Sequence, residues 1–211
     1  LATLCDVVPI ESLNRAFIRQ GLIVMRNRRN TGLAALADVA GLDKVVGEYE
    51  CGFVLGPRIN AAGRMGKSDI GVKLLLESDH EISVSLAIKL DELNKQRRSI
   101  EQEITVHATQ QAEAQLEENP DILVLVIADK SYNEGVLGIV AGRLKEQFAR
   151  PVFVLGVSPD NIAKGSGRSI PSIALGSLVL AARQSGILLT GGGHDMAAGA
   201  SLHVDKLEEF R

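Results

Sequence analysis

The sequence is poor in aromatic side chains: its 211 residues include no Trp, two Tyr and five Phe. Proteins that bind single-stranded nucleic acid without sequence preference commonly stack bases on aromatic rings, so the composition argues against a stacking platform. The two cysteines, Cys5 and Cys51, form neither a C-x-x-C motif nor a disulfide framework. This cysteine usage predicts a reducing, cytoplasmic compartment.

The sequence also lacks long apolar runs and a signal-peptide pattern, and none of its runs approaches the roughly 20 residues that cross a bilayer. Hydrophobic residues make up 45% of the chain, which excludes a disordered protein. We therefore expect a globular protein with no membrane association.

The net charge of -3 argues against nucleic-acid binding only as long as it is averaged over the chain. Residues 91–121 hold eight acids against three bases. In contrast, residues 11–29 hold five bases against one acid, and residues 139–170 hold five bases against two acids. This distribution favours a protein that binds a polyanion through two basic regions.

The chain opens on the apolar stretch 1–8, which ends at Pro9. We interpret this stretch as the end of a buried strand, and because its sheet neighbours are unaccounted for, we expect the chain to be part of a longer protein. Asp6 would then lie where α/β enzymes place metal ligands, at the carboxyl end of a strand. A single aspartate makes no metal site, and taken alone it is more often a helix or turn cap.

Four stretches carry helical patterns. Apolar positions recur at helical spacing over residues 11–26. Thr31 is expected to cap a short helix over residues 33–40 that Gly41 ends, and Ser68 can cap a helix that runs to Leu76. Residues 79–118 contain neither Pro nor Gly and keep a helical period throughout. Such a helix would be roughly 60 Å long at 1.5 Å per residue, too long for one small domain. We expect it to connect two domains.

After Pro120 the pattern changes to that of an α/β unit. The run 122–127 is apolar and β-branched, residues 136–148 have a helical pattern, and residues 151–155 form a second apolar run. This order predicts two parallel strands joined by a helix. A further helix is expected near residues 174–184.

Two glycine-rich runs are candidate binding motifs. Gly165-Ser166-Gly167-Arg168-Ser169 combines a hydroxyl and a guanidinium with glycines that let a backbone approach a phosphate, although it is no P-loop. A tight turn with an exposed arginine is the competing interpretation. Gly191-Gly192-Gly193-His194 predicts a close backbone approach, with His194 placed to donate to a phosphate. A flexible loop with an incidental histidine competes here.

The run Gly56-Pro57-Arg58-Ile59-Asn60-Ala61-Ala62-Gly63-Arg64 is loop-like in composition. Two arginines and an asparagine among small residues suit a groove that admits a bulky polyanion. A pair of structural arginines that bind backbone carbonyls is the alternative.

These motifs, in this order, resemble the RecJ family of single-strand-specific 5′→3′ exonucleases, in the DHH phosphoesterase superfamily. The resemblance covers nearly the whole chain and is carried by the runs 1–9, 55–64, 165–169 and 192–199. It also includes Leu93-Asn94 with Arg97, and Gly135-Val-Leu-Gly138-Ile-Val-Ala-Gly-Arg143-Leu144. Run 55–64 is the most specific of these.

The resemblance implies an α/β fold in three parts: the C-terminal portion of a DHH catalytic domain (1–78), a long interdomain helix (79–118) and a smaller DHH-associated nucleic-acid-binding domain with a mixed sheet (119–211). It implies two Mn²⁺ or Mg²⁺ ions that activate water for phosphodiester hydrolysis, with Asp6 as a catalytic metal ligand. The residues implied in phosphate and nucleic-acid binding are Arg58, Asn60, Arg64, Ser166, Arg168, Gly192, Gly193 and His194.

Two departures from the family pattern bear on activity. The earlier aspartate-rich and Asp-His-His motifs have no counterpart, so we expect this chain alone to be inactive. Asn133 stands where the family usually has His, and an amide cannot act as a proton donor as His can. The expected partners are single-stranded DNA and a single-strand-binding protein or helicase. Two alternatives remain open: a non-catalytic nucleic-acid-binding module, and a phosphodiesterase for short oligonucleotides or cyclic dinucleotides.

Overall fold

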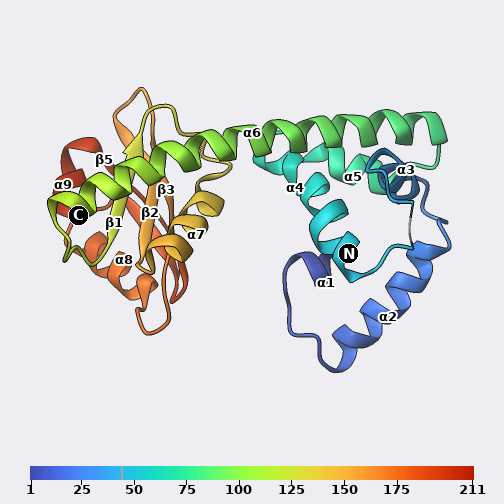
Figure 1. The fold of residues 1–211 in the computed structure, drawn as a ribbon, viewed down its shortest axis with the longest axis horizontal. Coiled ribbons are helices and arrows are strands. Elements are labelled where there is room, and N and C mark those ends of the chain that lie inside the picture. Colours follow the sequence, from blue (N-terminus) through green and yellow to red (C-terminus); the bar gives the residue numbers. More distant parts are fainter. Residues whose placement is uncertain (44) are drawn as a thin grey trace. The chain divides into compact units, whose positions relative to one another are not determined.

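The structure is a computed structural model that describes residues 1–43 and 45–211 (Figure 1). The chain divides into two units, Leu1–Arg98 and Ser99–Arg211, and each is described by itself. No helix in the described ranges is long and apolar enough to cross a membrane. The three domain boundaries expected from the sequence stay a prediction.

All regular secondary structure among the described residues of the first unit is helical. Its core gathers buried leucines and alanines, among them Leu36, Leu55 and Leu74. The elements are α1 (Ala2–Cys5), α2 (Ser12–Arg26), α3 (Thr31–Val39), the π-helix η1 (Glu50–Leu55), α4 (Gly56–Arg64), α5 (Asp69–Leu76) and the N-terminal half of α6 (His80–Glu118).

The helices expected near residues 11–26, 33–40 and 69–76 are confirmed, but their caps differ from the prediction. Asn30, not Thr31, caps α3, because its side-chain oxygen accepts from the N–H of Leu33 at 2.8 Å. Ser68 stands at the N-cap of α5 without a side-chain bond to the backbone. An Asn side chain reaches the third N–H of a helix as readily as Thr does, so composition did not separate the two.

The prediction of a buried strand at the start of the chain is wrong. Residues 2–5 form one helical turn, and Asp6 follows it with its N–H bonded to the carbonyl of Ala2 at 2.9 Å. No strand lies among the described residues of the first unit to pair with this stretch. Its backbone groups are therefore satisfied locally, in a helix.

The run 56–64 is also a helix, α4, and not a loop. Pro57 lies in its first turn, where no backbone N–H is needed. Ala61 and Ala62 are fully buried against the core. Gly56 has a packing reason, because a Cβ there would lie 2.2 Å from the sulfur of Cys5.

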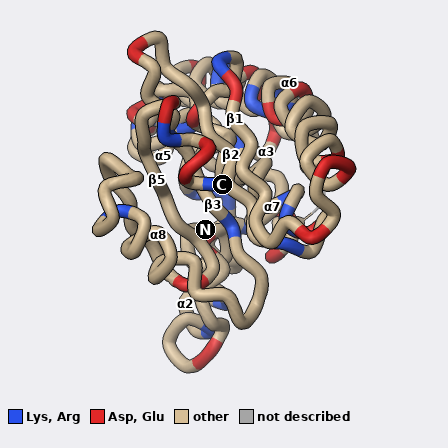
Figure 2. Tube along the Cα trace, turned by 90° about the vertical axis from the view of Figure 1, so that its left-hand side faces the viewer, with Lys and Arg blue, Asp and Glu red and all other residues tan. Residues whose placement is uncertain are grey.

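The long helix is confirmed. α6 runs from His80 to Glu118, and the Asp79 side chain accepts from the N–H of Ile82 at 2.9 Å, which caps its N-terminus. Its N-terminal half belongs to the first unit and its C-terminal half to the second. Acidic and basic positions both occur along it (Figure 2).

The second unit contains a five-stranded mixed sheet in the order β1-β2-β3-β5-β4. β1 and β2 are parallel, as predicted, and the other pairs are antiparallel. The remaining elements of this unit are β1 (Leu125–Asp129), α7 (Leu137–Phe148), β2 (Val152–Val157), β3 (Ile162–Arg168), α8 (Leu175–Gln184), β4 (Thr190–His194), β5 (Ala197–His203), η2 (Val204–Lys206) and α9 (Leu207–Phe210).

Helices cover both faces of this sheet (Figure 1). On one face, Leu125, Ile127 and Val154 pack with residues of α6 and α7. On the other face, Phe153 and Leu155 pack with residues of α8 and α9. The side chains of each strand therefore point alternately toward one helical layer and the other. Only every second residue of β3 can face α7.

Candidate nucleic-acid interface

The glycine run 165–169 is neither a phosphate-binding loop nor a tight turn, because residues 162–168 form β3, an inner strand of the sheet. Its backbone pairs with β2 on one side and β5 on the other, so its N–H groups are not available to a ligand. The glycines serve packing. A Cβ on Gly165 would lie 2.0 Å from the carbonyl oxygen of Val154, and one on Gly167 would lie 2.5 Å from the ring of Phe153.

The polar side chains of β3 point to the opposite face, toward α7. A Cβ placed on Gly138, in the first turn of α7, would lie 2.8 Å from Nη2 of Arg168 and 3.5 Å from Oγ of Ser166. Ser166 and Arg168 are both half-buried. The structure thus brings together the two predicted phosphate-binding residues beside the start of a helix.

The start of α7 adds favourable electrostatics to this cluster. In the part of the chain that the structure describes, the N–H groups of Leu137 and Gly138 have no acceptor, and no acidic residue lies in the first turn. A helix N-terminus carries partial positive charge and binds anions. The hydroxyl of Ser166, the guanidinium of Arg168 and these N–H groups are donors that lie beside one another, and we call this set the β3–α7 site; Nη1 of Arg168 also donates to the carbonyl of Gly167 at 2.9 Å.

Gly138 is the residue that sequence reasoning missed. It appears in the run that resembles the RecJ family, but nothing in the local pattern showed that its missing side chain leaves room for Arg168. A glycine in the first turn of a predicted helix was the available signal, because glycine disfavours helix.

Asn133 lies in the connection between β1 and α7. Its side-chain oxygen accepts from the N–H of Gly135 at 2.9 Å, a turn that leads into α7. Next to it, Glu134 forms an ion pair with Lys164 of β3, with 2.8 Å between Oε2 and Nζ. The hydrogen bond from Lys164 to Glu134 and the charge of that carboxylate raise the pKa of Lys164 above its ordinary value.

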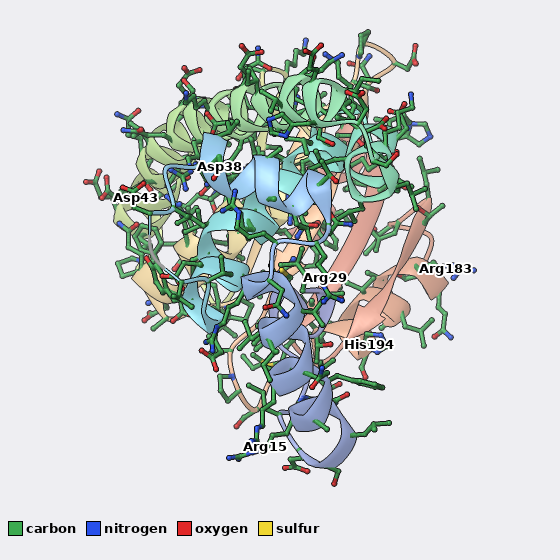
Figure 3. All side chains as sticks on the ribbon, turned by 90° about the vertical axis from the view of Figure 1, so that its right-hand side faces the viewer. Arg15, Arg29, Asp38, Asp43, Arg183 and His194 are labelled. Atoms are coloured by element: carbon green, nitrogen blue, oxygen red, sulfur yellow. The ribbon has the colours of Figure 1, made fainter. Side chains whose placement is uncertain are left out.

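The second glycine run is a strand, so the flexible-loop interpretation is wrong. β4 pairs with β5 in a hairpin, and His194 lies exposed at its end (Figure 3). Gly193 has a packing reason, since a Cβ there would lie 2.3 Å from the carbonyl oxygen of Ala197. A Cβ on Gly192 would meet nothing within 4 Å, so the space beside this exposed residue is open.

A surface cavity of ≈ 520 Å³ adjoins His194. It is lined by residues of the β4–β5 hairpin and of the first two turns of α8: Gly176, Ser177, Leu180, Gly193, His194, Asp195 and Met196. This cavity is large enough for part of a nucleotide.

In the first unit, the three predicted residues of α4 differ in how exposed they are. Asn60 and Arg64 lie one turn apart on the exposed face, whereas the Arg58 side chain is only 14% exposed. Nε of Arg58 pairs with Oδ1 of Asp91 at 2.9 Å, and Nη1 donates to the carbonyl of Val54 at 2.8 Å. Arg58 thus binds a backbone carbonyl and a carboxylate within the fold, as the alternative interpretation of a structural arginine predicts.

Asp91 accepts from two cations. Its Oδ2 lies 2.9 Å from Nζ of Lys95, in addition to the bond with Arg58. Burial acts to raise the pKa of Asp91, but the hydrogen bonds from Lys95 and Arg58 outweigh it and hold that pKa below its ordinary value. Asp91 therefore stays ionised and fixes the orientation of Arg58.

Asp6 lies exposed after α1. No group of three or more His, Cys, Asp or Glu side chains that could hold a metal ion occurs among residues 1–43 and 45–211. The described residues therefore do not fit a two-metal centre by themselves.

The basic stretch 11–29 is the helix α2 and its continuation. Its arginines include Arg15 and Arg29, which are exposed and project from the ribbon (Figure 3). These side chains are available to a polyanion.

Comparison with known proteins shows what the chain is similar to. The DHHA1 domain family matches residues 119–211. The single-stranded-DNA-specific exonuclease RecJ of Dickeya dadantii is 43% identical and that of Escherichia coli 39% identical, over all of this chain but only 38% and 37% of their own lengths. The crystal structure of Thermus thermophilus RecJ in complex with Mg²⁺ superimposes with a TM-score of 0.86 at 31% identity, covering 99% of this chain and 31% of that one. A structure of exonuclease RecJ bound to manganese gives a TM-score of 0.81 at 31% identity and covers 99% of this chain and 50% of that one. The chain is therefore similar over its whole length to part of the RecJ proteins, and its residues 119–211 match the DHHA1 domain family.

Proposed function

We propose that the chain is a segment of a single-stranded-DNA-specific 5′→3′ exonuclease that hydrolyses phosphodiester bonds, releases 5′-mononucleotides and acts in DNA repair and recombination. The homology to RecJ proteins supports this activity. The observation that carries it is the β3–α7 site, where Ser166 and Arg168 meet the first turn of α7.

The β3–α7 site suits a terminal phosphate. Arg168 supplies a guanidinium that bonds the carbonyl of Gly167 through Nη1 and lies beside Gly138 with Nη2, Ser166 supplies a hydroxyl, and the first turn of α7 supplies two N–H groups, so a phosphate bound here could accept from all three elements. A phosphate monoester at a 5′ end offers more charge and more oxygens than an internal phosphodiester. We therefore assign the 5′ phosphate of the strand to this site.

The other predicted residues would hold the strand itself. His194 can donate to a phosphate from the β4–β5 hairpin, and the open space beside Gly192 leaves room for close approach next to Gly193. In the first unit, Asn60 and Arg64 offer donors on the exposed face of α4, and Arg58 supports that helix from its half-buried side.

The metal ions of the proposed enzyme need ligands beyond the described residues. RecJ structures have been determined with Mg²⁺ and with Mn²⁺, and these ions prefer several oxygen ligands. Asp6 would contribute one carboxylate. We propose a Mn²⁺- or Mg²⁺-dependent full-length enzyme in which other aspartates and histidines supply the remainder, acting in the cytoplasm with a helicase or single-strand-binding protein.

The test is a nuclease assay on the full-length protein that contains this chain. We expect Mn²⁺-dependent release of mononucleotides from single-stranded DNA that proceeds from the 5′ end, and no release from a matched duplex. The 211-residue chain, assayed alongside, should release none, because it lacks a metal-ligand cluster in its described residues.

The same metal finding favours one other candidate, a non-catalytic nucleic-acid-binding module. Tight binding of single strands by the full-length protein without any release of nucleotides would support that candidate and refute the exonuclease. Preferential cleavage of cyclic or very short substrates would instead favour a small-nucleotide phosphodiesterase.

A further inference from the structure

An ion pair lies at the edge of the β3–α7 site. Lys164 and Glu134 are 63% and 55% exposed, with 2.8 Å between Nζ and Oε2. Exposed pairs of this kind stabilise a fold only slightly and open readily. Because the pair lies beside a proposed phosphate site, it can also affect how that site binds DNA.

Lys164 shares the face of β3 that carries Ser166 and Arg168. Side chains at alternate positions of a strand point the same way and are spaced by about 6.6 Å, twice the rise per residue. Positions 164, 166 and 168 therefore form a line of donors along one strand. Such a line runs away from the 5′-phosphate position at Arg168.

Glu134 comes from a different element, the connection that leads into α7. Asn133 Oδ1 bonds the N–H of Gly135, which flanks Glu134 on the other side, so the backbone around the carboxylate is held in a turn. A carboxylate at this place neutralises Lys164 and repels any phosphate that approaches it. When Lys164 exchanges Glu134 for a phosphate, its neutralisation by Glu134 ends, whereas the carboxylate keeps its charge and still repels the phosphate.

We propose that Lys164 binds a backbone phosphate of the single strand, next to the 5′ phosphate at Arg168, and that Glu134 holds Lys164 as a competing anion until DNA displaces it. This inference rests on the proposed function, because it places the strand along β3. Lys164 thus adds a phosphate contact, and Glu134 sets how much that contact contributes to affinity.

The two partners should give opposite effects when they are neutralised one at a time. Binding of a 5′-phosphorylated oligothymidylate by the full-length protein is measured by fluorescence anisotropy, in EDTA so that no strand is cut, over a series of salt concentrations. Glu134→Gln should tighten binding about 1.5- to 5-fold, the range expected when an exposed ion pair no longer has to open. Lys164→Gln should weaken binding and lower the salt slope by about 0.7, the loss of one single-strand phosphate contact.

A matched ion pair in the same unit controls for net charge. Lys206 and Glu209 are 46% and 53% exposed, with 2.7 Å between their charged atoms. Glu209→Gln and Lys206→Gln change the net charge in the same way as the test variants, and both should leave the Kd within twofold of the unmodified protein. Glu134→Gln added to Lys164→Gln should tighten binding less than it does alone.

Equal effects of Glu134→Gln and Glu209→Gln, or an unchanged salt slope in Lys164→Gln, would overturn the inference. These binding results are independent of the nuclease assay. If the full-length protein released no mononucleotides, the proposed nuclease function would be refuted. The binding measurements on the Glu134 and Lys164 variants would still decide whether Lys164 contacts the strand. Thermal melting of each variant confirms that the fold is kept, since both side chains are exposed.

Discussion

Replacement of Gly138 by alanine should damage the β3–α7 site without damaging the fold. The new Cβ would lie 2.8 Å from Nη2 of Arg168 and 3.5 Å from Cζ of the same side chain. The atoms that clash are the far end of a flexible side chain, so Arg168 moves aside while the backbone stays in place. Alanine also favours helix over glycine by about 0.5–1 kcal/mol, so we expect an unchanged or slightly raised Tm.

The expected loss of affinity follows from the bond that Arg168 gives up. A hydrogen bond to a charged group contributes about 1.5–3 kcal/mol, and each 1.4 kcal/mol corresponds to tenfold in Kd. Gly138→Ala in the full-length protein should therefore bind a 5′-phosphorylated single strand about 10- to 150-fold more weakly. The assay is fluorescence anisotropy in EDTA.

Gly142→Ala is the matched control. Gly142 lies one turn further along α7, and a Cβ there meets nothing within 4 Å. The control adds the same methyl group to the same helix, so its Kd should not change. If Gly138→Ala bound the 5′-phosphorylated strand as tightly as Gly142→Ala does, the assignment of phosphate to this site would be refuted.

Three further predictions concern stability and reactivity. The pKa of Asp91 is lowered in the folded protein, so its carboxylate contributes stability above about pH 4 that is lost as the pH falls through the folded pKa. Asp91→Asn should therefore lower the free energy of unfolding at pH 7 by about 1–3 kcal/mol. Urea titrations of both proteins at pH 3 should show a smaller difference between them. Gly165→Ala places a Cβ 2.0 Å from the backbone oxygen of Val154 and should lower the free energy of unfolding by at least about 1–3 kcal/mol. Gly192→Ala, where a Cβ meets nothing, should leave the Tm unchanged. Equal melting curves for the two variants would show that close packing against β2 is not the reason for Gly165. Burial raises the pKa of the Cys51 thiol, so alkylation followed by mass spectrometry at pH 7.5 should be slow in the native protein and fast in urea; fast native alkylation would show that the thiol is accessible.

Elements with strong local patterns could be predicted from the sequence. The stretch 79–118 has no residue that breaks a helix, and α6 occupies nearly all of it. The apolar runs on either side of α7 became the parallel pair β1 and β2, although β1 lies later than the predicted 122–127. In both cases the signal is a local pattern of apolar residues along the chain, and it can be recognised without knowing which distant residues pack against it.

Glycine-rich runs misled because their composition is ambiguous. Gly165 and Gly167 predicted a loop, but they lack side chains because β2 packs closely against them. That reason involves Phe153 and Val154, in another strand, and no local pattern shows it. The same holds for Gly56, where Cys5 occupies the space of a side chain, and for α4, whose Ala61 and Ala62 are buried against distant residues of the core.

The candidate site was predicted by residue type more accurately than by geometry. Ser166 and Arg168 were identified as phosphate donors, and the structure brings them together on one face of β3. The helix N-terminus above them and the space at Gly138 depend on how α7 packs on the sheet. Such tertiary contacts become visible only in the folded chain.

The most direct test of the account compares two ligands that differ only at one end. The ratio of the Kd for a 5′-hydroxyl strand to the Kd for a 5′-phosphorylated strand is measured for the unmodified full-length protein and for Arg168→Ala. We predict a ratio well above one for the unmodified protein and a ratio close to one for the variant, because the guanidinium is the charged donor of the β3–α7 site. An equal loss of affinity for both strands in Arg168→Ala would contradict the assignment and leave Arg168 only a general electrostatic role.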